Sequence, residues 1–222
     1  MNRAASQSLT AWIVRTLEKH FTEPVWPGPK DFLTQLIGTL LSQNTNDRNA
    51  EAAFQNLLNR YRDWHAVMNS PVRQIATAIR TAGLGNQKAR HIKSLLQWIN
   101  KTWATFDLSF LCHEDANTLA TLFLAQKGIG VKTLSVTLMA ACGHDVFPVD
   151  THVHRLCTRL GLVPAKFTAE KTFIQMQSLV PKGKGYSLHH NLIRLGRTIC
   201  QARRPQCAIC PLAAKCLSAA HK

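Results

Sequence analysis

Apolar residues recur at intervals of three and four along most of the chain, which is the spacing of amphipathic helices. The first run spans residues 8–21, and a proline-rich linker at 24–29 separates it from a second apolar helix that begins near Asp31. Ser70 followed by Pro71 is typical of a helix start. Strand-like alternation, internal repeats and low-complexity tracts are absent from the sequence, so the predicted fold class is all-α. Further helices are predicted over 49–61, 71–81, 88–103, 114–126, 151–160, 168–180 and 187–200.

A glycine-rich turn at residues 127–131 (K-G-I-G-V) lies between two segments with helical spacing and predicts a tight helical hairpin. Glycine tolerates left-handed backbone angles and the close approach of another backbone. The amides of Gly128, Gly130 and Val131 then point outward at a helix start, where an anion is favoured. Most turns of this kind bind nothing, so the turn alone is weak support for a binding site.

The charge balance is the outlying feature of the composition. The 222 residues include 27 Lys and Arg against 12 Asp and Glu, which gives a formal net charge of +15. The expected partner is therefore a polyanion, nucleic acid first and a membrane surface second. No apolar run is long enough to enter a membrane, and the N-terminus lacks the apolar stretch of a secretory signal. We expect a cytoplasmic protein without a membrane partner, associated with the nucleoid if it is bacterial.

Two side chains near the hairpin are candidates for catalysis. Lys132 follows the glycines on the first turn of the next helix, where the positive end of the helix dipole favours the neutral amine that a nucleophile needs. Asp150 stands just before another helix, where helix amides favour an ionised carboxylate. The ordinary interpretations are a solvated lysine and an N-cap. Capping and catalysis are compatible for Asp150.

The motifs G-I-G-V-K-T at 128–133 and F-P-V-D-T-H at 147–152 resemble those of the helix-hairpin-helix DNA glycosylases with a Gly/Pro-rich loop and a catalytic aspartate. Within these, the chain is similar to the endonuclease III branch, whose members carry both the lysine and the aspartate. The resemblance runs from about Phe32 to Cys216 and implies that Lys132 and Asp150 are catalytic. The DNA contacts that it implies at these motifs are Gly128, Gly130, Val131 and His152.

The resemblance also implies roles for two loops. In the family the L-S-x-x-T-x-D segment, here 41–47, lies at the DNA-facing mouth, and a glutamine there helps to fill the gap left by an extruded base. Asn44 occupies that position in this chain, with Gln43 beside it. The family places a leucine wedge where this chain has Leu84, although a leucine between two glycines is most often only a turn residue. Apolar wedges of this kind offset the cost of unstacking.

Four cysteines near the C-terminus form the pattern C-x6-C-x2-C-x5-C, which is typical of a metal or cluster site. Four thiolates satisfy zinc, but the two close cysteine pairs that are usual for zinc are absent. The spacing resembles the [4Fe–4S] site of endonuclease III relatives, and a loop folded around that cluster would present Arg203 and Arg204 to phosphate. The implied cluster ligands are Cys200, Cys207, Cys210 and Cys216.

Three further cysteines lie outside this pattern, namely Cys112, Cys142 and Cys157. An odd total of seven cysteines without an export signal indicates a reducing compartment and ligand chemistry rather than disulfides. We therefore expect these three to be small buried apolar residues.

The resemblance implies two helical domains with the active site in the cleft between them. A helical barrel with the helix-hairpin-helix motif would span 27–144, and an iron–sulfur cluster domain would combine 1–26 with 145–222. The implied partner is double-stranded DNA that contains damaged bases or abasic sites, bound by a monomer.

The implied reaction is base excision on a flipped nucleotide. Lys132 attacks C1′ of the sugar, Asp150 stabilises the developing positive charge, and β-elimination from the Schiff base nicks the strand. Oxidised or ring-saturated pyrimidines are the implied substrates, but the S-Q-N-T motif at 42–45 is also similar to plant 5-methylcytosine glycosylases. A modified cytosine or a mismatched thymine is therefore a second possible substrate.

Two rival functions are a catalytically weak DNA-binding relative and a redox protein. The retained lysine and aspartate disfavour the first, and the second leaves the basic charge unexplained.

Overall fold

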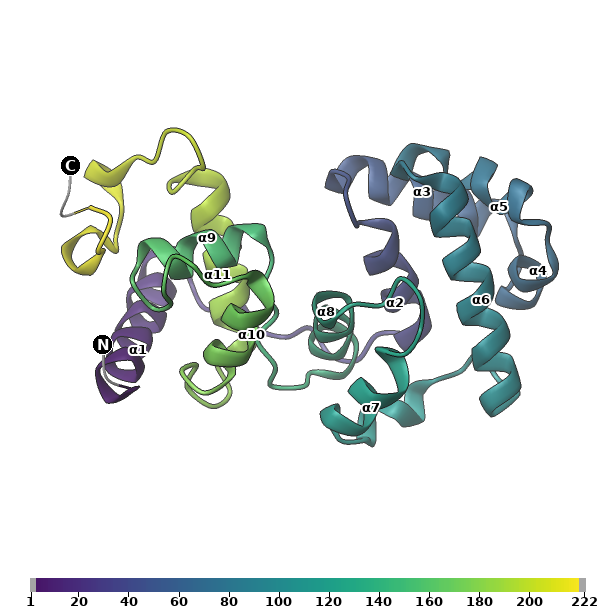
Figure 1. Ribbon diagram of the computed structural model, residues 1–222, viewed down its shortest axis with the longest axis horizontal. Helices are drawn as coiled ribbons and strands as arrows, with labels where there is room; N and C mark the ends of the chain where they lie inside the picture. Colours follow the sequence, from purple (N-terminus) through teal and green to yellow (C-terminus); the bar gives the residue numbers. More distant parts are fainter. Residues whose placement is uncertain (1–2, 220–222) are drawn as a thin grey trace. The chain divides into compact units, whose positions relative to one another are not determined.

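The computed structural model describes residues 3–219, and within them helices are the only regular secondary structure (Figure 1). The predicted all-α class is therefore confirmed. Contacts divide the chain into two compact units, which we call unit 1 (Met1–Pro27 with Asp145–Lys222) and unit 2 (Gly28–His144). None of the helices in the described part of the chain has the length and apolar composition needed to cross a membrane.

Unit 2 is built around α2 (Phe32–Leu41), whose six large apolar side chains are all fully buried. In Figure 1, α8 (Val131–Cys142) lies beside α2 and packs on it, as do α3 (Asp47–Arg60) and α6 (Gly85–Trp103). A helix whose large apolar side chains are all buried fixes the positions of the helices packed on it. The other elements of unit 2 are α4 (Trp64–Asn69), α5 (Val72–Ala78) and α7 (Ala116–Phe123), with the 3₁₀-helices η1 (Arg80–Ala82) and η2 (Ser109–His113).

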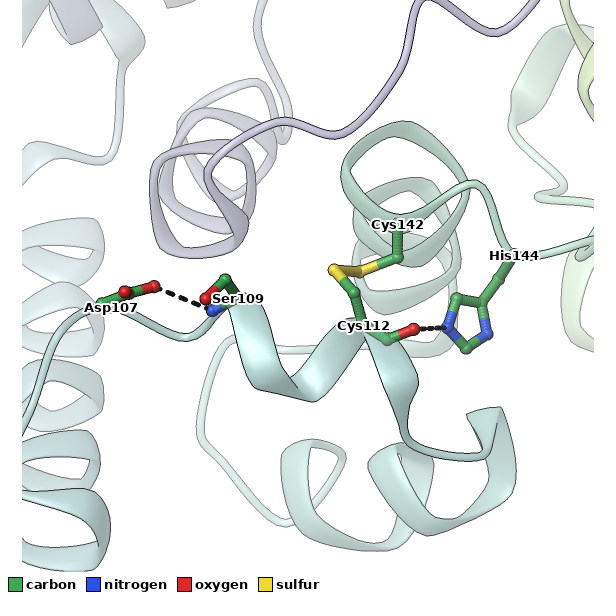
Figure 2. Close-up of a disulfide and its surroundings, with 5 residues drawn as sticks. All are labelled: Asp107, Ser109, Cys112, Cys142 and His144. Atoms are coloured by element: carbon green, nitrogen blue, oxygen red, sulfur yellow. Dashed lines mark hydrogen bonds between the residues drawn. A yellow bond between two sulfur atoms is a disulfide. The ribbon is translucent and has the colours of Figure 1, made fainter.

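A disulfide between Cys112 of η2 and Cys142 of α8 joins two segments of unit 2, with their Cα atoms 4.9 Å apart (Figure 2). Nε2 of His144 donates to the carbonyl oxygen of Cys112 at 3.2 Å. The expectation that Cys112 and Cys142 are unpaired apolar residues was wrong, because the sequence does not reveal that η2 packs against α8. Cys157 is fully buried, as expected.

Unit 1 combines the N-terminal helix with the C-terminal part of the chain. Figure 1 shows α1 (Arg3–Phe21), in purple, beside the yellow-green α11 (Gly185–Thr198), and the two helices pack together. Glu18 of α1 reinforces this contact, because its Oε1 accepts from Nζ of Lys184 at 3.0 Å and from Oγ of Ser187 at 2.7 Å. The remaining elements of unit 1 are α9 (Thr151–Arg159), α10 (Ala169–Gln177), η3 (Cys207–Ile209) and η4 (Ala213–Lys215).

Side-chain caps fix the first turn of several helices, as Asp, Asn and Thr do at helix starts. Ser70, however, does not start α5 as predicted. Its hydroxyl donates to the Ala66 carbonyl oxygen at 2.9 Å and so closes α4, while Pro71 stands at the start of α5 without a side-chain hydrogen bond. The capping residues are Asp31, Asn46, Asp63, Asp115, Asp150 and Thr168.

We predict that the disulfide stabilises unit 2. It closes a loop with a sequence separation of 30, and cross-links of this size reduce the entropy of the unfolded chain, so the double substitution Cys112→Ala and Cys142→Ala should cost about 2–4 kcal/mol. Urea unfolding of oxidised protein measures the loss. Reductant should lower the wild-type midpoint to that of the double variant and leave the variant unchanged. A wild-type midpoint that ignores reductant would show that the two cysteines are not linked in solution.

Candidate functional site

The turn between α7 and α8 requires glycine at Gly128. Its φ is +88°, a left-handed conformation that residues with side chains rarely adopt, and an added Cβ would overlap Nδ1 of His91. His91 belongs to α6, so the hairpin turn is packed directly against another helix of unit 2. The glycine therefore permits both the turn and this close packing.

Gly130 is different, because the protein's own packing does not require it. It is exposed, and nothing lies within 4 Å of the position that an added Cβ would take. Gly130 is the N-cap of α8, and in the described part of the chain the N–H groups of Gly130, Val131 and Lys132 have no acceptor. The missing side chain and the open amides leave this helix terminus accessible to a phosphate.

Lys132 is exposed on the first turn of α8. Within residues 3–219 its amine has neither a hydrogen-bond acceptor nor an acidic partner. The next residue, Thr133, is buried, and its Oγ1 accepts a hydrogen bond from Nε2 of Gln43 at 2.8 Å. Lys132 is thus a free amine on a well-anchored helix terminus, directly beside the open amides.

Asp150 is the N-cap of α9, and its Oδ1 accepts a hydrogen bond from the Val153 amide at 2.7 Å. The carboxylate is half-buried. His152 follows on the same helix, and its Nδ1 accepts from Nη2 of Arg155 at 3.2 Å. Asp150 and His152 belong to unit 1, whereas Lys132 and the hairpin belong to unit 2.

Asn44 and Leu84 share an unusual backbone conformation. Their φ angles are +53° and +50°, and both side chains are exposed, Leu84 to 55%. Asparagine tolerates the left-handed region, but leucine rarely occupies it. Strained residues that display their side chains to solvent often have a binding role.

Gln43 does not project outward with its neighbour. Its Nε2 donates to the carbonyl oxygen of Gly128 at 2.9 Å as well as to Thr133. The sequence suggested Gln43 as a DNA contact, and its amide instead connects the loop after α2 to the hairpin. A direct contact between Gln43 and DNA remains a prediction.

The four C-terminal cysteines line one cavity of about 220 Å³, and none of them is disulfide-bonded. Arg159 of α9 also lines this cavity, with Nη1 3.3 Å from Sγ of Cys200. The same side chain donates to the carbonyl oxygens of Gln201 at 2.8 Å and Ala202 at 2.7 Å, so it orders the loop that carries two exposed arginines. Those arginines are Arg203, which lines the cavity, and Arg204.

The donor set of the cavity, four free thiols, is of the kind that binds metal centres. Among residues 3–219, no group of three or more His, Cys, Asp or Glu side chains is arranged to hold one metal ion. Four thiols around a common cavity are compatible with that result, because each thiolate of a [4Fe–4S] site binds a different iron and the sulfurs stand farther apart. Burial raises the pKa of the Cys210 thiol, and the neighbouring cysteines act in the same direction.

Residues 37–182 match the HhH-GPD superfamily of base excision DNA repair proteins. The chain belongs to this superfamily. It is 33% identical to endonuclease III of Sulfolobus acidocaldarius over 193 residues, which cover 84% of the chain and 82% of that relative. Protein ROS1A of Oryza sativa is 28% identical over 171 residues, 69% of the chain, but the chain spans only 9% of its length.

Solved structures support the same placement. The chain is similar to endonuclease III in a non-covalent DNA complex, with a TM-score of 0.82 and 25% identity over 97% of both chains. A thermostable thymine-DNA glycosylase shares the fold, with a TM-score of 0.80 and 20% identity over 98% of this chain and all of that one. This HhH-GPD protein is thus an endonuclease III-like DNA glycosylase of base excision repair.

Sequence reasoning missed two arginines of this HhH-GPD protein. Arg155 donates through Nη2 to the carbonyl oxygens of Gly196 and Cys200, both at 3.0 Å, and burial lowers its pKa. Arg155 and Arg159 together connect α9 to residues 196–202, the segment that leads into the cysteine cavity. Asp150 caps the first turn of the same helix. The spacing of the two arginines, four residues on one helix face, was the available signal.

We predict that the cap and the charge of Asp150 can be separated by substitution. Asp150→Ala removes the acceptor for the Val153 amide and should destabilise the protein by about 1 kcal/mol. Asp150→Asn keeps a side-chain oxygen in place and should stay close to the wild type in urea unfolding. Equal stability of the two variants would show that this hydrogen bond contributes nothing. The stable Asn variant then reports on the charge alone in activity assays.

Proposed function

We propose that this chain is a bifunctional DNA glycosylase and AP lyase that removes oxidised or ring-saturated pyrimidines from double-stranded DNA. The observation that carries the proposal is the position of Lys132, a free exposed amine adjoining the open amides of Gly130 and Val131. A phosphate bound by those amides would bring the sugar of a flipped nucleotide within reach of the lysine. Because no ion pair or hydrogen bond holds this amine, it can approach the sugar and, once deprotonated, act as a nucleophile.

The reaction follows from that amine. Nζ of Lys132 forms a bond to C1′, the bond from C1′ to the base breaks, and the base leaves with the electron pair and takes up a proton. The bond from C1′ to the ring oxygen O4′ then breaks, O4′ takes up a proton, and a protonated Schiff base between Nζ and C1′ remains. Loss of a proton from C2′ then breaks the bond from C3′ to its oxygen and nicks the strand 3′ to the lesion. Water finally hydrolyses the imine and frees Lys132.

The other predicted residues support this step. The Asp150 carboxylate offsets the positive charge that develops at C1′. Leu84, an exposed apolar side chain held in a strained turn, would fill the space that the flipped base leaves. Arg203 and Arg204 are exposed on the loop that Arg159 orders, where they would contact phosphate.

A different damaged or modified base is the second candidate substrate. The observation that favours it is Asn44, which is shorter than the family's glutamine and stands in a left-handed conformation. A side chain of different reach at the DNA-facing mouth would change which orphaned or flipped base is accepted. Assays on duplexes with a ring-saturated pyrimidine, a mismatched thymine or 5-methylcytosine distinguish these substrates.

We also propose that Cys200, Cys207, Cys210 and Cys216 hold a [4Fe–4S] cluster. Their free thiols around one cavity, with Arg159 beside Cys200, support the assignment. When bound, the cluster would organise the C-terminal loop and present Arg203 and Arg204.

We predict that Lys132→Gln abolishes covalent chemistry. The substitution keeps length and polarity but removes the nucleophile, so borohydride trapping on lesion-containing DNA and strand cleavage should both disappear. DNA binding, measured by fluorescence anisotropy, should remain. Lys127→Gln is the matched control, because Lys127 is also an exposed lysine of the hairpin region and should still trap.

Two results would contradict this assignment. Trapping by Lys132→Gln would show that another amine is the nucleophile. A wild-type chain that neither traps nor nicks any lesion or abasic duplex would identify a DNA-binding relative without catalysis.

We predict that the purified protein is yellow-brown and contains four irons per chain, as a [4Fe–4S] site requires. Cys207→Ser should lose iron, visible absorption and solubility, because the C-terminal loop depends on the cluster. Cys157→Ala is the control, since this thiol is fully buried, its pKa is raised to about 12 by burial, and it does not line the cavity. A colourless protein with one zinc per chain would reverse the assignment.

A further inference from the structure

Lys88 is a buried lysine of unit 2 that the proposed reaction does not use. It is the fourth residue of α6, and its side chain is almost completely inaccessible, with a residue exposure of 3%. Burial lowers the pKa of its ammonium group. A buried charge is tolerated only when its hydrogen bonds are satisfied.

Three main-chain carbonyl oxygens satisfy the ammonium group of Lys88. Its Nζ donates to Leu41 at 2.8 Å, to Gln43 at 2.7 Å and to Ala82 at 2.8 Å. An ammonium group has three protons, so every donor has one acceptor. Leu41 is the last residue of α2 and Ala82 the last of η1, and helix ends of this kind carry partial negative charge.

These carbonyls belong to the two loops that carry the DNA-facing candidates. Gln43 immediately precedes Asn44, and Ala82 lies two residues before Leu84. Lys88 therefore connects the loop after α2 to the turn before α6, two segments that are far apart in the sequence. The hydrogen bonds to Leu41 and Gln43 have sequence separations of 47 and 45.

Gln43 extends the connection to the hairpin. While its carbonyl oxygen accepts from Lys88, its side-chain Nε2 donates to the Gly128 carbonyl oxygen and to Thr133. Two side chains thus join three segments of unit 2, each of which carries a candidate DNA contact. All three segments lie within one compact unit, so their mutual arrangement is a property of that unit.

The backbone strain at Asn44 and Leu84 needs such a constraint. Both residues have left-handed φ angles, and strained residues persist only where the surroundings determine the conformation. On its other side the Leu84 turn is restricted by α5, because an added Cβ at Gly85 would lie 3.2 Å from the Ala76 carbonyl oxygen. Lys88 supplies the restraint on the side of α2.

We propose that Lys88 is a positioning residue for base extrusion, which holds the Asn44 loop and the Leu84 turn at one fixed separation so that both enter the duplex together. The inference rests on the proposed glycosylase function. It assigns no contact between Lys88 and DNA, because the ammonium group is buried and its protons are used. Loss of the ammonium group would let the two loops move independently and weaken the opening of a base pair.

The test compares Lys88→Met with Lys93→Met. Lys93 lies on the same helix, and its Nζ also donates to a main-chain carbonyl oxygen, that of Ser70 at 2.7 Å, which belongs to neither loop. Both variants lose one positive charge. Excision of dihydrouracil is measured in single-turnover reactions on two substrates, a fully paired duplex and a duplex with the lesion in a small unpaired bubble.

For Lys88→Met we expect excision from the paired duplex to fall on the order of 10- to 100-fold, as for other displaced positioning groups. Excision from the bubble should stay near the wild-type rate, because no base pair has to be opened there. Binding to undamaged duplex should be unchanged. A 2-aminopurine base opposite an abasic site should brighten when wild type or Lys93→Met binds, but not when Lys88→Met binds.

The outcomes separate the role of Lys88 from the proposed function. The positioning role would be overturned if Lys88→Met lost the same excision rate on both substrates, or if Lys93→Met showed an equal loss. Normal 2-aminopurine brightening with Lys88→Met would overturn it as well. Should Lys88→Met not fold, Lys88→Arg keeps the charge but cannot direct one proton to each carbonyl, and the same selective loss is expected at smaller amplitude. A wild-type chain inactive on every lesion would instead overturn the proposed function.

Discussion

The packing of α8 on the buried helix α2 is the interaction on which the candidate site of unit 2 depends. The Lys30 amide donates to the Ala141 carbonyl oxygen at one end of the pair, and Gln43 donates to Gly128 at the other, so the helices run antiparallel. The end of α2 and the start of α8 therefore meet. Because the apolar side chains of α2 are fully buried, this meeting point cannot shift without exposing the core.

The two helix termini that meet here differ in whether their partial charges are neutralised within the protein. The negative end of α2 is neutralised from inside by the Lys88 ammonium group, whereas the positive end of α8 is left open. Only the second terminus can attract an external anion. In a chain with a net charge of +15, we therefore expect a polyanion to bind at the hairpin rather than at the neighbouring helix end.

The sequence was informative where a local constraint determines the structure. Gly128 needs glycine because of its own backbone angle, and Asp150 caps the helix that follows it, so both were predictable from their neighbours. The Cys112–Cys142 disulfide and the burial of Lys88 depend on packing between segments far apart in sequence. Composition and spacing contain no signal for either. The cysteine pattern was an exception, because its four residues lie close enough in sequence to line one cavity.

The same constraints bear on how this chain would fill the gap left by a flipped base. Position 44 has a φ of +53°, where asparagine is favoured over glutamine because its short side chain tolerates the left-handed region. The adjacent Gln43 cannot supply the longer side chain that position 44 lacks, because its amide nitrogen already donates to Gly128 and Thr133. Leu84 is then the remaining large side chain in these two loops that is free to enter the duplex, with 55% of its surface exposed. Under the proposed function we therefore expect the Leu84 wedge to carry most of the gap-filling, and Asn44 to offer a polar contact to the opposite base.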